Sequence, residues 1–242
     1  MELTLVDNPT ELAQRAAEWV TETIERALTT QPRFTIALSG GSTPKALHAL
    51  LAQPPLRNRI DWARVHVFWG DERHVPFGDE RNNARMAYDT LLNHVPVRPE
   101  HIHVMRTDKE PVASMDAYAR TLHQYFDGEP HTFDLVLLGM GDDGHTLSLF
   151  PGTAVIHEDV AWTSAFYLEP QAMYRLTLTA PVVNKAAAVA FLVAGAGKAH
   201  ALREVLKGEN NPDKYPSQRI KPELGTLTWF VDKAAYQVVS GK

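Results

Sequence analysis

The 242-residue sequence contains no cysteine, which excludes disulfide bonds, thiolate metal sites and cysteine nucleophiles. It has no run of about 18 apolar residues, so no membrane-spanning segment is expected. Its first residues lack the basic and apolar regions of a secretory signal peptide. There is no basic tract and the net charge is −5, which argues against a general nucleic-acid-binding protein. We therefore expect a cytoplasmic protein with neither a nucleic-acid nor a membrane partner.

The chain does contain a regular alternation of short apolar runs and amphipathic stretches, and its hydrophobic share of 44% is that of a globular protein. The apolar runs predict strands at residues 34–38, 64–69, 101–105, 133–138, 188–194 and 227–231, with further extended segments at 160–166 and 173–178. Helical spacing predicts helices at about 9–27, 44–51, 82–92, 111–126 and 195–208. This alternation predicts an α/β fold with a mostly parallel sheet flanked by helices on both faces. No repeat or linker is visible, so residues 1–242 are expected to form a single domain.

The most informative stretch is residues 133–152, where a buried strand is expected to run into a glycine-rich turn. Three glycines (Gly139, Gly141 and Gly144) let the chain turn sharply, and the turn carries Asp142, Asp143 and His145. Ligands in open α/β sheets bind beyond the carboxyl ends of the strands. The turn is therefore the expected chemical centre, although these residues alone would also suit a solvated loop.

Two other interpretations of this turn are less favoured. The glycine spacing matches the dinucleotide-binding pattern G-x-G-x-x-G, but Pro151-Gly152 interrupts the following helix and the two aspartates would repel a pyrophosphate. One histidine and two aspartates within four residues could suggest a metal site. No ligand pattern such as H-E-x-x-H accompanies them, so no metal is expected.

Polar residues also follow other predicted strands. Residues 39–45 form a Gly-Gly turn that enters a helix, with Thr43 as its expected N-cap, and free backbone N–H groups there could bind an anion. A plain tight turn would explain the same residues, and the Walker A ending is missing. Residues 70–76 gather charged side chains at a strand end, as an active site or a solvated loop would. Lys198 in the first turn of a helix opposes the helix dipole, and an anion held between them would resolve that conflict.

Taken together, these segments resemble the 6-phosphogluconolactonase family, within the superfamily that also contains glucosamine-6-phosphate deaminase. The resemblance covers nearly the whole chain and depends on four ordered pieces together with the Lys198 helix start. The pieces are Leu38-Ser-Gly-Gly-Ser-Thr-Pro44, Gly70-Asp-Glu-Arg-His-Val-Pro76, Gly139-Met-Gly-Asp-Asp-Gly-His-Thr146 with Ser148-Leu-Phe-Pro151, and Leu227-Thr-Trp-Phe-Val-Asp232. Two departures stand out: Leu147 replaces the usual Ala, and residues 81–84 replace a common Ser-Asn-Tyr, which puts the packing near Asn82 in question.

The resemblance implies hydrolysis of 6-phosphoglucono-1,5-lactone in the oxidative pentose phosphate pathway, without a metal or organic cofactor. It implies that His145 is the general base and that Asp143 orients it. Arg73 and Lys198 are implied to bind the phosphate. The remaining implied substrate-binding residues are Asp71 and the backbone of Gly40, Gly41, Ser42 and Thr43. The implied partner is thus a small phosphosugar lactone, and we expect a monomer or a weak homo-oligomer.

Two alternatives from other functional classes remain. A glucosamine-6-phosphate deaminase would carry a glutamate that assists the catalytic histidine, but the corresponding position holds Phe150. A non-enzymatic phosphosugar sensor would carry a DNA-binding helix-turn-helix, for which the segment before Phe34 has no room.

Overall fold

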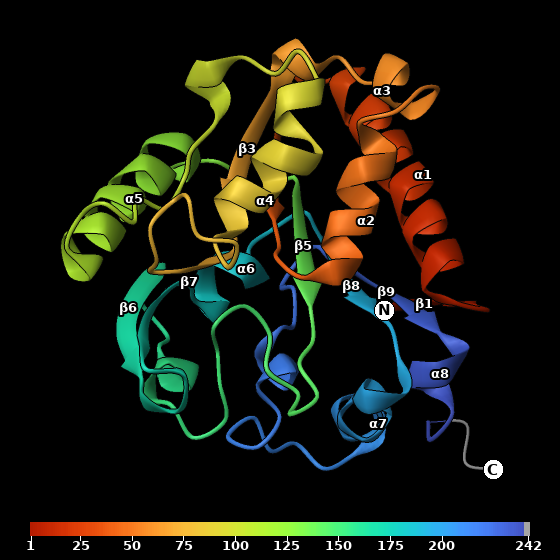
Figure 1. Ribbon diagram of the computed structural model, residues 1–242, viewed down its shortest axis with the longest axis vertical. Helices are drawn as coiled ribbons and strands as arrows, with labels where there is room; N and C mark the ends of the chain where they lie inside the picture. Colours follow the sequence, from red (N-terminus) through yellow and green to blue (C-terminus); the bar gives the residue numbers. More distant parts are fainter. Residues whose placement is uncertain (240–242) are drawn as a thin grey trace.

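The computed structural model describes residues 1–239. Its centre is a six-stranded sheet, ordered β1-β9-β8-β5-β2-β3, in which every neighbouring pair is parallel (Figure 1). The strands are β1 (Glu2–Val6), β2 (Phe34–Leu38), β3 (Val65–Trp69), β5 (Leu135–Gly139), β8 (Ala188–Val193) and β9 (Thr226–Asp232). Every residue of β2 and β8 is buried, as expected for apolar strands covered on both faces. The α/β class and the mostly parallel sheet are therefore confirmed.

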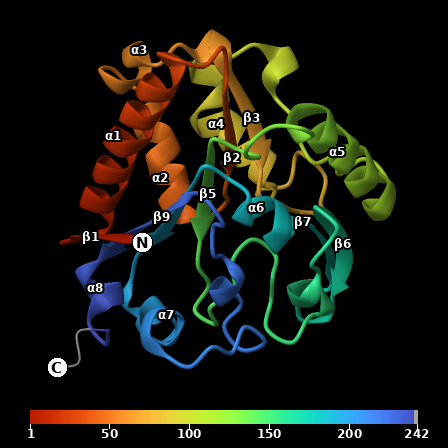
Figure 2. The same ribbon diagram turned by 180° about the vertical axis from the view of Figure 1, so that it is seen from behind.

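Helices flank this sheet. Helices α1, α2 and α4 pack side by side in front of the strands in Figure 1, and Figure 2 shows the sheet from behind. Helix α5 packs against β3 because Tyr118 and Phe126 contact Phe68. The helices are α1 (Pro9–Leu28), α2 (Ser42–Leu51), α3 (Leu56–Arg59), α4 (Asn83–Thr90), α5 (Pro111–Phe126), α6 (Ala180–Asn184), α7 (Ala199–Lys207) and α8 (Lys233–Tyr236). None of the helices described in residues 1–239 is long and apolar enough to cross a membrane.

A second, antiparallel sheet of three strands was not predicted. It has the order β4-β7-β6, with β4 (Asp71–Arg73), β6 (Thr163–Leu168) and β7 (Met173–Leu178). Gly70 joins the two sheets, because its N–H donates to Leu38 O of β2 at 2.9 Å and its C=O accepts from Leu178 N of β7 at 2.8 Å. The sequence shows the extended segments but carries no signal for which partner a three-residue strand such as β4 will choose.

Two local predictions were wrong, and one strand was missed. Residues 101–105 are not a strand: Pro99–His101 is a 3₁₀ turn and only one bridge, between Ile102 and Val67, follows it. The edge strand β1 was missed, because its half-exposed residues give no buried run. Thr43 is not the N-cap of α2; the cap position is Gly41, whose φ of 103° suits glycine and which makes no side-chain cap.

The order of the strands places the ligand site. From β2 the chain moves outward to β3, then returns to β5 on the other side of β2 and continues outward to β8 and β9. The strand order thus reverses between β2 and β5, and ligands of open parallel sheets bind at such a switch point, beyond the carboxyl ends. The loop after β5 extends from this edge toward α7 in both views (Figures 1 and 2).

Candidate active site

A pocket of about 220 Å³ lies at the switch point between β2 and β5. Six of the predicted site residues line it: Gly40, Gly41, Asp71, Arg73, His145 and Lys198. Arg175, Asn83 and Leu147 also line it. These residues come from segments more than 150 positions apart in the sequence, and the parallel sheet brings them to one edge. Ser42 and Thr43 do not line the pocket; they form the first turn of α2 beside it.

His145 and Asp143 form a pair at the pocket. The ring Nδ1 of His145 lies 2.6 Å from Asp143 Oδ1, and the His145 backbone N–H donates to the same oxygen at 3.0 Å. Since an ionised carboxylate only accepts, Nδ1 carries a proton, and in the neutral imidazole the lone pair is therefore on Nε2. Within residues 1–239, no hydrogen bond to Nε2 is found. The geometry is that of a base held by a third group.

The carboxylate of Asp143 is stabilised in its charged form. Burial acts to raise the pKa of Asp143, but the hydrogen bonds from the His145 ring and backbone outweigh it, and the pKa lies below its ordinary value. Asp143 therefore stays ionised near neutral pH and can stabilise a protonated imidazole. A negative charge at this position favours the proton transfer that a general base performs.

Gly141 makes room for this pair. A Cβ at residue 141 would lie 2.0 Å from His145 Nδ1 and 2.5 Å from Asp143 Oδ1, distances that no side chain tolerates. The turn is closed by a hydrogen bond from Gly141 N to His145 O at 2.8 Å. Gly141 therefore serves the close approach of the histidine and not, as the dinucleotide pattern would require, the approach of a pyrophosphate.

The ring of Phe150 covers one face of His145, with the ring centroids 4.2 Å apart. The guanidinium of Arg175 lies over the same phenyl ring, 5.2 Å from its centroid. Phe150 thus contacts both the imidazole and a buried cation. It also occupies the position where a deaminase would carry its assisting glutamate.

Arg175 belongs to a buried polar cluster that sequence reasoning missed. Its Nη2 donates to Asp71 Oδ2 at 2.8 Å and its Nε to Ser148 Oγ at 2.9 Å, while Ser148 Oγ donates to Asp71 Oδ2 at 2.7 Å. The side chains of Arg175 and Asp71 are only 4% and 8% exposed. Burial acts to raise the pKa of Asp71, but the charges of Arg175 and Arg73 and these hydrogen bonds bring it below the ordinary range. The available signal in the sequence was Arg175 itself, the one charged residue of the β7 segment, which indicates a buried partner of opposite charge.

The two predicted phosphate ligands, Arg73 and Lys198, line the same pocket. Arg73 Nη1 donates to the carbonyl of Arg81 at 3.0 Å, and its buried Nε has no partner in the described part of the chain. Lys198 Nζ lies 2.5 Å from Asp142 Oδ1, and Asp142 is 71% exposed. The anion expected beside Lys198 is therefore, in this structure, the carboxylate of Asp142.

The packing near Asn82, which the departures from the family pattern had put in question, is regular. The Asn82 side chain accepts from Arg85 N at 2.8 Å and caps helix α4. Asn83 Nδ2 donates to the Asp71 carbonyl at 3.0 Å, and a Cβ at residue 40 would lie 2.0 Å from Asn83 Oδ1. Asn83 thus fixes the distance between β4 and the Gly40 turn.

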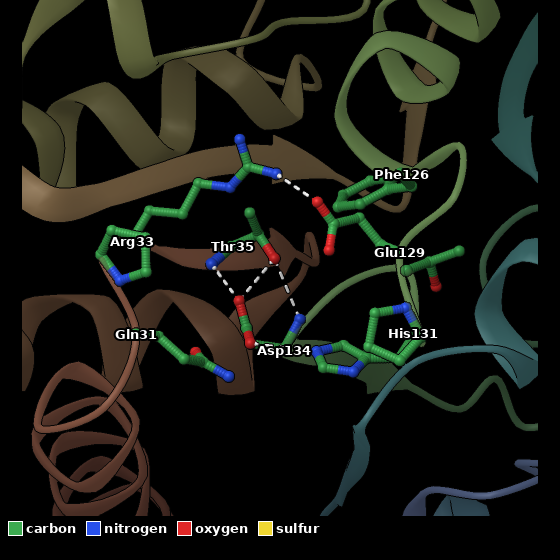
Figure 3. A pocket seen from close by; sticks show the side chains of 10 residues that line it. Gln31, Arg33, Thr35, Phe126, Glu129, His131 and Asp134 are labelled. Atoms are coloured by element: carbon green, nitrogen blue, oxygen red, sulfur yellow. Dashed lines mark hydrogen bonds and ion pairs between the residues drawn. The ribbon is translucent and has the colours of Figure 1, made fainter.

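A larger hollow, of about 460 Å³, lies at the opposite edge, at the amino ends of β2 and β5 (Figure 3). Several of its polar groups are paired with one another: Thr35 and Asp134 exchange hydrogen bonds of 2.7 and 3.0 Å, and Arg33 Nη2 lies 3.8 Å from Glu129. His131 Nε2 lies 3.3 Å from Asp134. The smaller pocket lies at the switch point of the sheet and brings six of the predicted site residues together, so it is the better candidate.

Residues 7–229 match the family described as glucosamine-6-phosphate isomerases/6-phosphogluconolactonase. The chain belongs to this family. A 6-phosphogluconolactonase of Synechocystis sp. is 41% identical over 228 residues, which cover 93% of this chain and 92% of that protein. A 6-phosphogluconolactonase of Haemophilus influenzae is 35% identical over 206 residues, covering 84% and 87%.

Solved structures of the glucosamine-6-phosphate isomerase/6-phosphogluconolactonase family share the fold. The 6-phosphogluconolactonase from Trypanosoma brucei matches with a TM-score of 0.86 and 26% identity, covering 98% of both chains. A structure described as devB protein matches with a TM-score of 0.86 and 31% identity, covering 98% of this chain and 99% of that one.

Within residues 1–239, no group of three or more His, Asp or Glu side chains has an arrangement that could hold a metal ion.

Proposed function

We propose that the protein hydrolyses 6-phosphoglucono-1,5-lactone to 6-phosphogluconate, a step of the oxidative pentose phosphate pathway. The observation that carries this proposal is the His145–Asp143 pair, whose Nε2 is free in a pocket that also holds Arg73 and Lys198. The family relatives named 6-phosphogluconolactonase support the same reaction. The protein is accordingly a lactonase, a carboxylic ester hydrolase, and we propose that it acts in the cytoplasm.

In the proposed mechanism, His145 Nε2 accepts a proton from a water molecule as the water oxygen attacks the lactone carbonyl carbon. Asp143 stabilises the imidazolium that results. The tetrahedral intermediate then collapses by breaking the bond to the ring oxygen, and His145 returns its proton to that oxygen. The products are a free hydroxyl and a carboxylic acid that ionises, so His145 ends in its starting state.

The phosphate of the substrate would bind between Arg73 and Lys198, with the backbone around Gly40 and Gly41 beside it. Charge-assisted hydrogen bonds of this kind contribute roughly 1.5–3 kcal/mol each. Asp142 would have to give up its contact with Lys198 when the phosphate arrives, and its exposure makes that movement easy.

Lys198→Ala and Arg73→Ala are each expected to raise KM for the phosphorylated lactone by roughly tenfold or more, because tenfold corresponds to about 1.4 kcal/mol, less than one such bond. Neither change should alter the slower turnover of unphosphorylated gluconolactone. Steady-state kinetics on both substrates checks this. Lys207→Ala, at the far end of α7, is the matched control and should behave as the wild type. Equal losses on both substrates would place the phosphate elsewhere.

The test of the proposed function is an assay on freshly generated 6-phosphogluconolactone, corrected for spontaneous hydrolysis. We expect turnover of this lactone and no release of ammonia from glucosamine 6-phosphate, since Phe150 supplies no carboxylate beside His145. Ammonia release without lactone hydrolysis would favour the deaminase instead.

A further inference from the structure

Glu72 is a buried carboxylate that lies beside the pocket but does not line it. It is the central residue of β4 and is only 1% exposed. Its oxygens accept from three backbone N–H groups: Oε1 from Arg73 at 2.8 Å and Asn83 at 2.7 Å, and Oε2 from Ala84 at 2.8 Å. No ion pair of Glu72 is found within residues 1–239.

Burying a carboxylate without a cation beside it is costly, so the presence of Glu72 at this position calls for an explanation. Capping helix α4 accounts for part of it, since Glu72 satisfies the first two free N–H groups of the helix, Asn83 and Ala84. The helix already has Asn82 as its own N-cap. That N-cap side chain accepts only from Arg85 N, so Glu72 takes up the two N–H groups before it, and its third hydrogen bond, from Arg73 N, lies outside the helix.

The backbone groups that Glu72 binds belong to residues of the pocket. Arg73 and Asn83 both line it. The Asn83 side chain in turn contacts β4 through the Asp71 carbonyl and faces the Gly40 turn. The Glu72 carboxylate therefore connects β4, which carries Arg73, to the first residues of α4, which border the Gly40 turn.

We propose that Glu72 is a positioning residue, which in its carboxylate form fixes Arg73 and Asn83 at the distance that binding of a phosphorylated sugar acid requires. The proposal rests on the proposed function for the identity of the ligand. Glu72 itself touches neither the substrate nor the reacting atoms.

The charge of Glu72 gives this role a pH signature. Burial raises the pKa of Glu72 to about 7, although the three N–H groups stabilise the carboxylate. The charged groups that act on it are Asp71, which also raises this pKa, and the guanidinium of Arg175. As the pH falls below about 7, Glu72 takes up a proton, loses part of its hold on the three N–H groups, and ligand affinity should fall.

The experiment is a calorimetric titration with 6-phosphogluconate at pH 8 and pH 6, on the wild type and on Glu72→Gln. The glutamine side chain has the size of glutamate, but its NH₂ group replaces one of the two accepting oxygens and cannot accept from a backbone N–H. At pH 8 we expect Glu72→Gln to weaken binding roughly tenfold, equivalent to about 1.4 kcal/mol. The wild type should lose affinity between pH 8 and pH 6 by more than the variant does. In lactone hydrolysis the variant should raise KM, with kcat within about threefold of the wild type.

The matched control is Asp134→Asn, which changes a carboxylate that also accepts from a backbone N–H, at the opposite edge of the sheet. It should leave affinity unchanged at both pH values. Glu72→Asp keeps the charge with a shorter reach and should restore part of the affinity. Equal affinity of Glu72→Gln and wild type at pH 8, or unfolding of both Glu72 variants, would overturn the proposal.

Because the readout is binding, the two proposals fail separately. A wild type that binds 6-phosphogluconate with Glu72-dependent affinity but hydrolyses no lactone would remove the proposed function alone. A wild type that hydrolyses the lactone while Glu72→Gln binds normally would remove only the positioning role. If the wild type does not bind 6-phosphogluconate, the positioning role is also overturned, and the lactone assay alone then decides the proposed function.

Discussion

His145→Ala is expected to lower kcat for lactone hydrolysis by roughly 10²- to 10⁴-fold, the usual contribution of a positioned general base. The reason is the free Nε2 in the pocket, with Nδ1 held by Asp143 at 2.6 Å. The unfolding midpoint should change little, since the side chain is partly exposed and contacts only Asp143 and the ring of Phe150 among the bonds and ring contacts described. Initial rates and thermal unfolding of the same preparations check both expectations.

The chain offers a matched control for this variant. His157 and Asp213 form a second His–Asp pair, also at 2.6 Å, with both side chains more than 60% exposed. His157→Ala should therefore leave kcat unchanged. Asp143→Asn should cost less than His145→Ala, because the amide oxygen can still orient the ring while the charge is lost. Near wild-type kcat in His145→Ala would remove this residue from the mechanism.

Arg175→Met is expected to have the largest effect on stability, lowering the free energy of unfolding by about 3–5 kcal/mol. The change leaves the Asp71 carboxylate buried without its cation, and Ser148 remains its only described side-chain donor of normal length. Equilibrium urea unfolding at pH 7 measures the loss. Arg81→Met is the matched control, since it removes a surface ion pair with a 2.7 Å contact, in which Arg81 is 55% and Asp79 is 23% exposed, and it should cost less than about 1 kcal/mol.

The loss of stability in Arg175→Met should depend on pH, and the sign of this dependence follows from the pKa of Asp71. In the wild type that pKa is lowered in the folded state, so Asp71 adds stability above the ordinary carboxyl pKa and loses it only as the pH falls through the lowered value. Without Arg175, burial raises the pKa of Asp71 and its ionised form destabilises the fold. The difference between variant and wild type should therefore be largest near pH 7 and shrink toward about pH 4. A constant difference would mean that Arg175 acts through packing alone.

The parts of the fold that could be predicted from the sequence are those that one segment determines. Buried strands such as β2 and β8 are continuous apolar runs, and α1 has its Asn8 cap and an apolar stripe. The turn after β5 was recognisable as the chemical centre because it follows a buried strand and because the family resemblance covers it; its residues alone would also suit a solvated loop. The meeting of Arg73, His145 and Lys198 followed from the parallel sheet, since carboxyl ends share an edge.

What could not be predicted depends on contacts between distant segments. The partner of β4 is β7, about one hundred residues later, and no local pattern specifies that pairing. The same pairing places Arg175 opposite Arg73 in register and creates the buried cluster with Asp71. Asp142 looked like part of the catalytic turn, yet only the three-dimensional path of α7 shows that it neutralises Lys198.

The peptide unit at Gly70 has a consequence beyond topology. Its N–H belongs to one sheet and its C=O to the other, and a Cβ there would come within 2.7 Å of Leu147, two residues after His145. Leu147 has a backbone φ of 54°, in the left-handed region that residues other than glycine seldom adopt. Gly70 thus lies between β3 and β4, the strand that carries Arg73, and it also borders the loop that carries His145. A change at this one position, which carries no functional group, would disturb substrate affinity and turnover together.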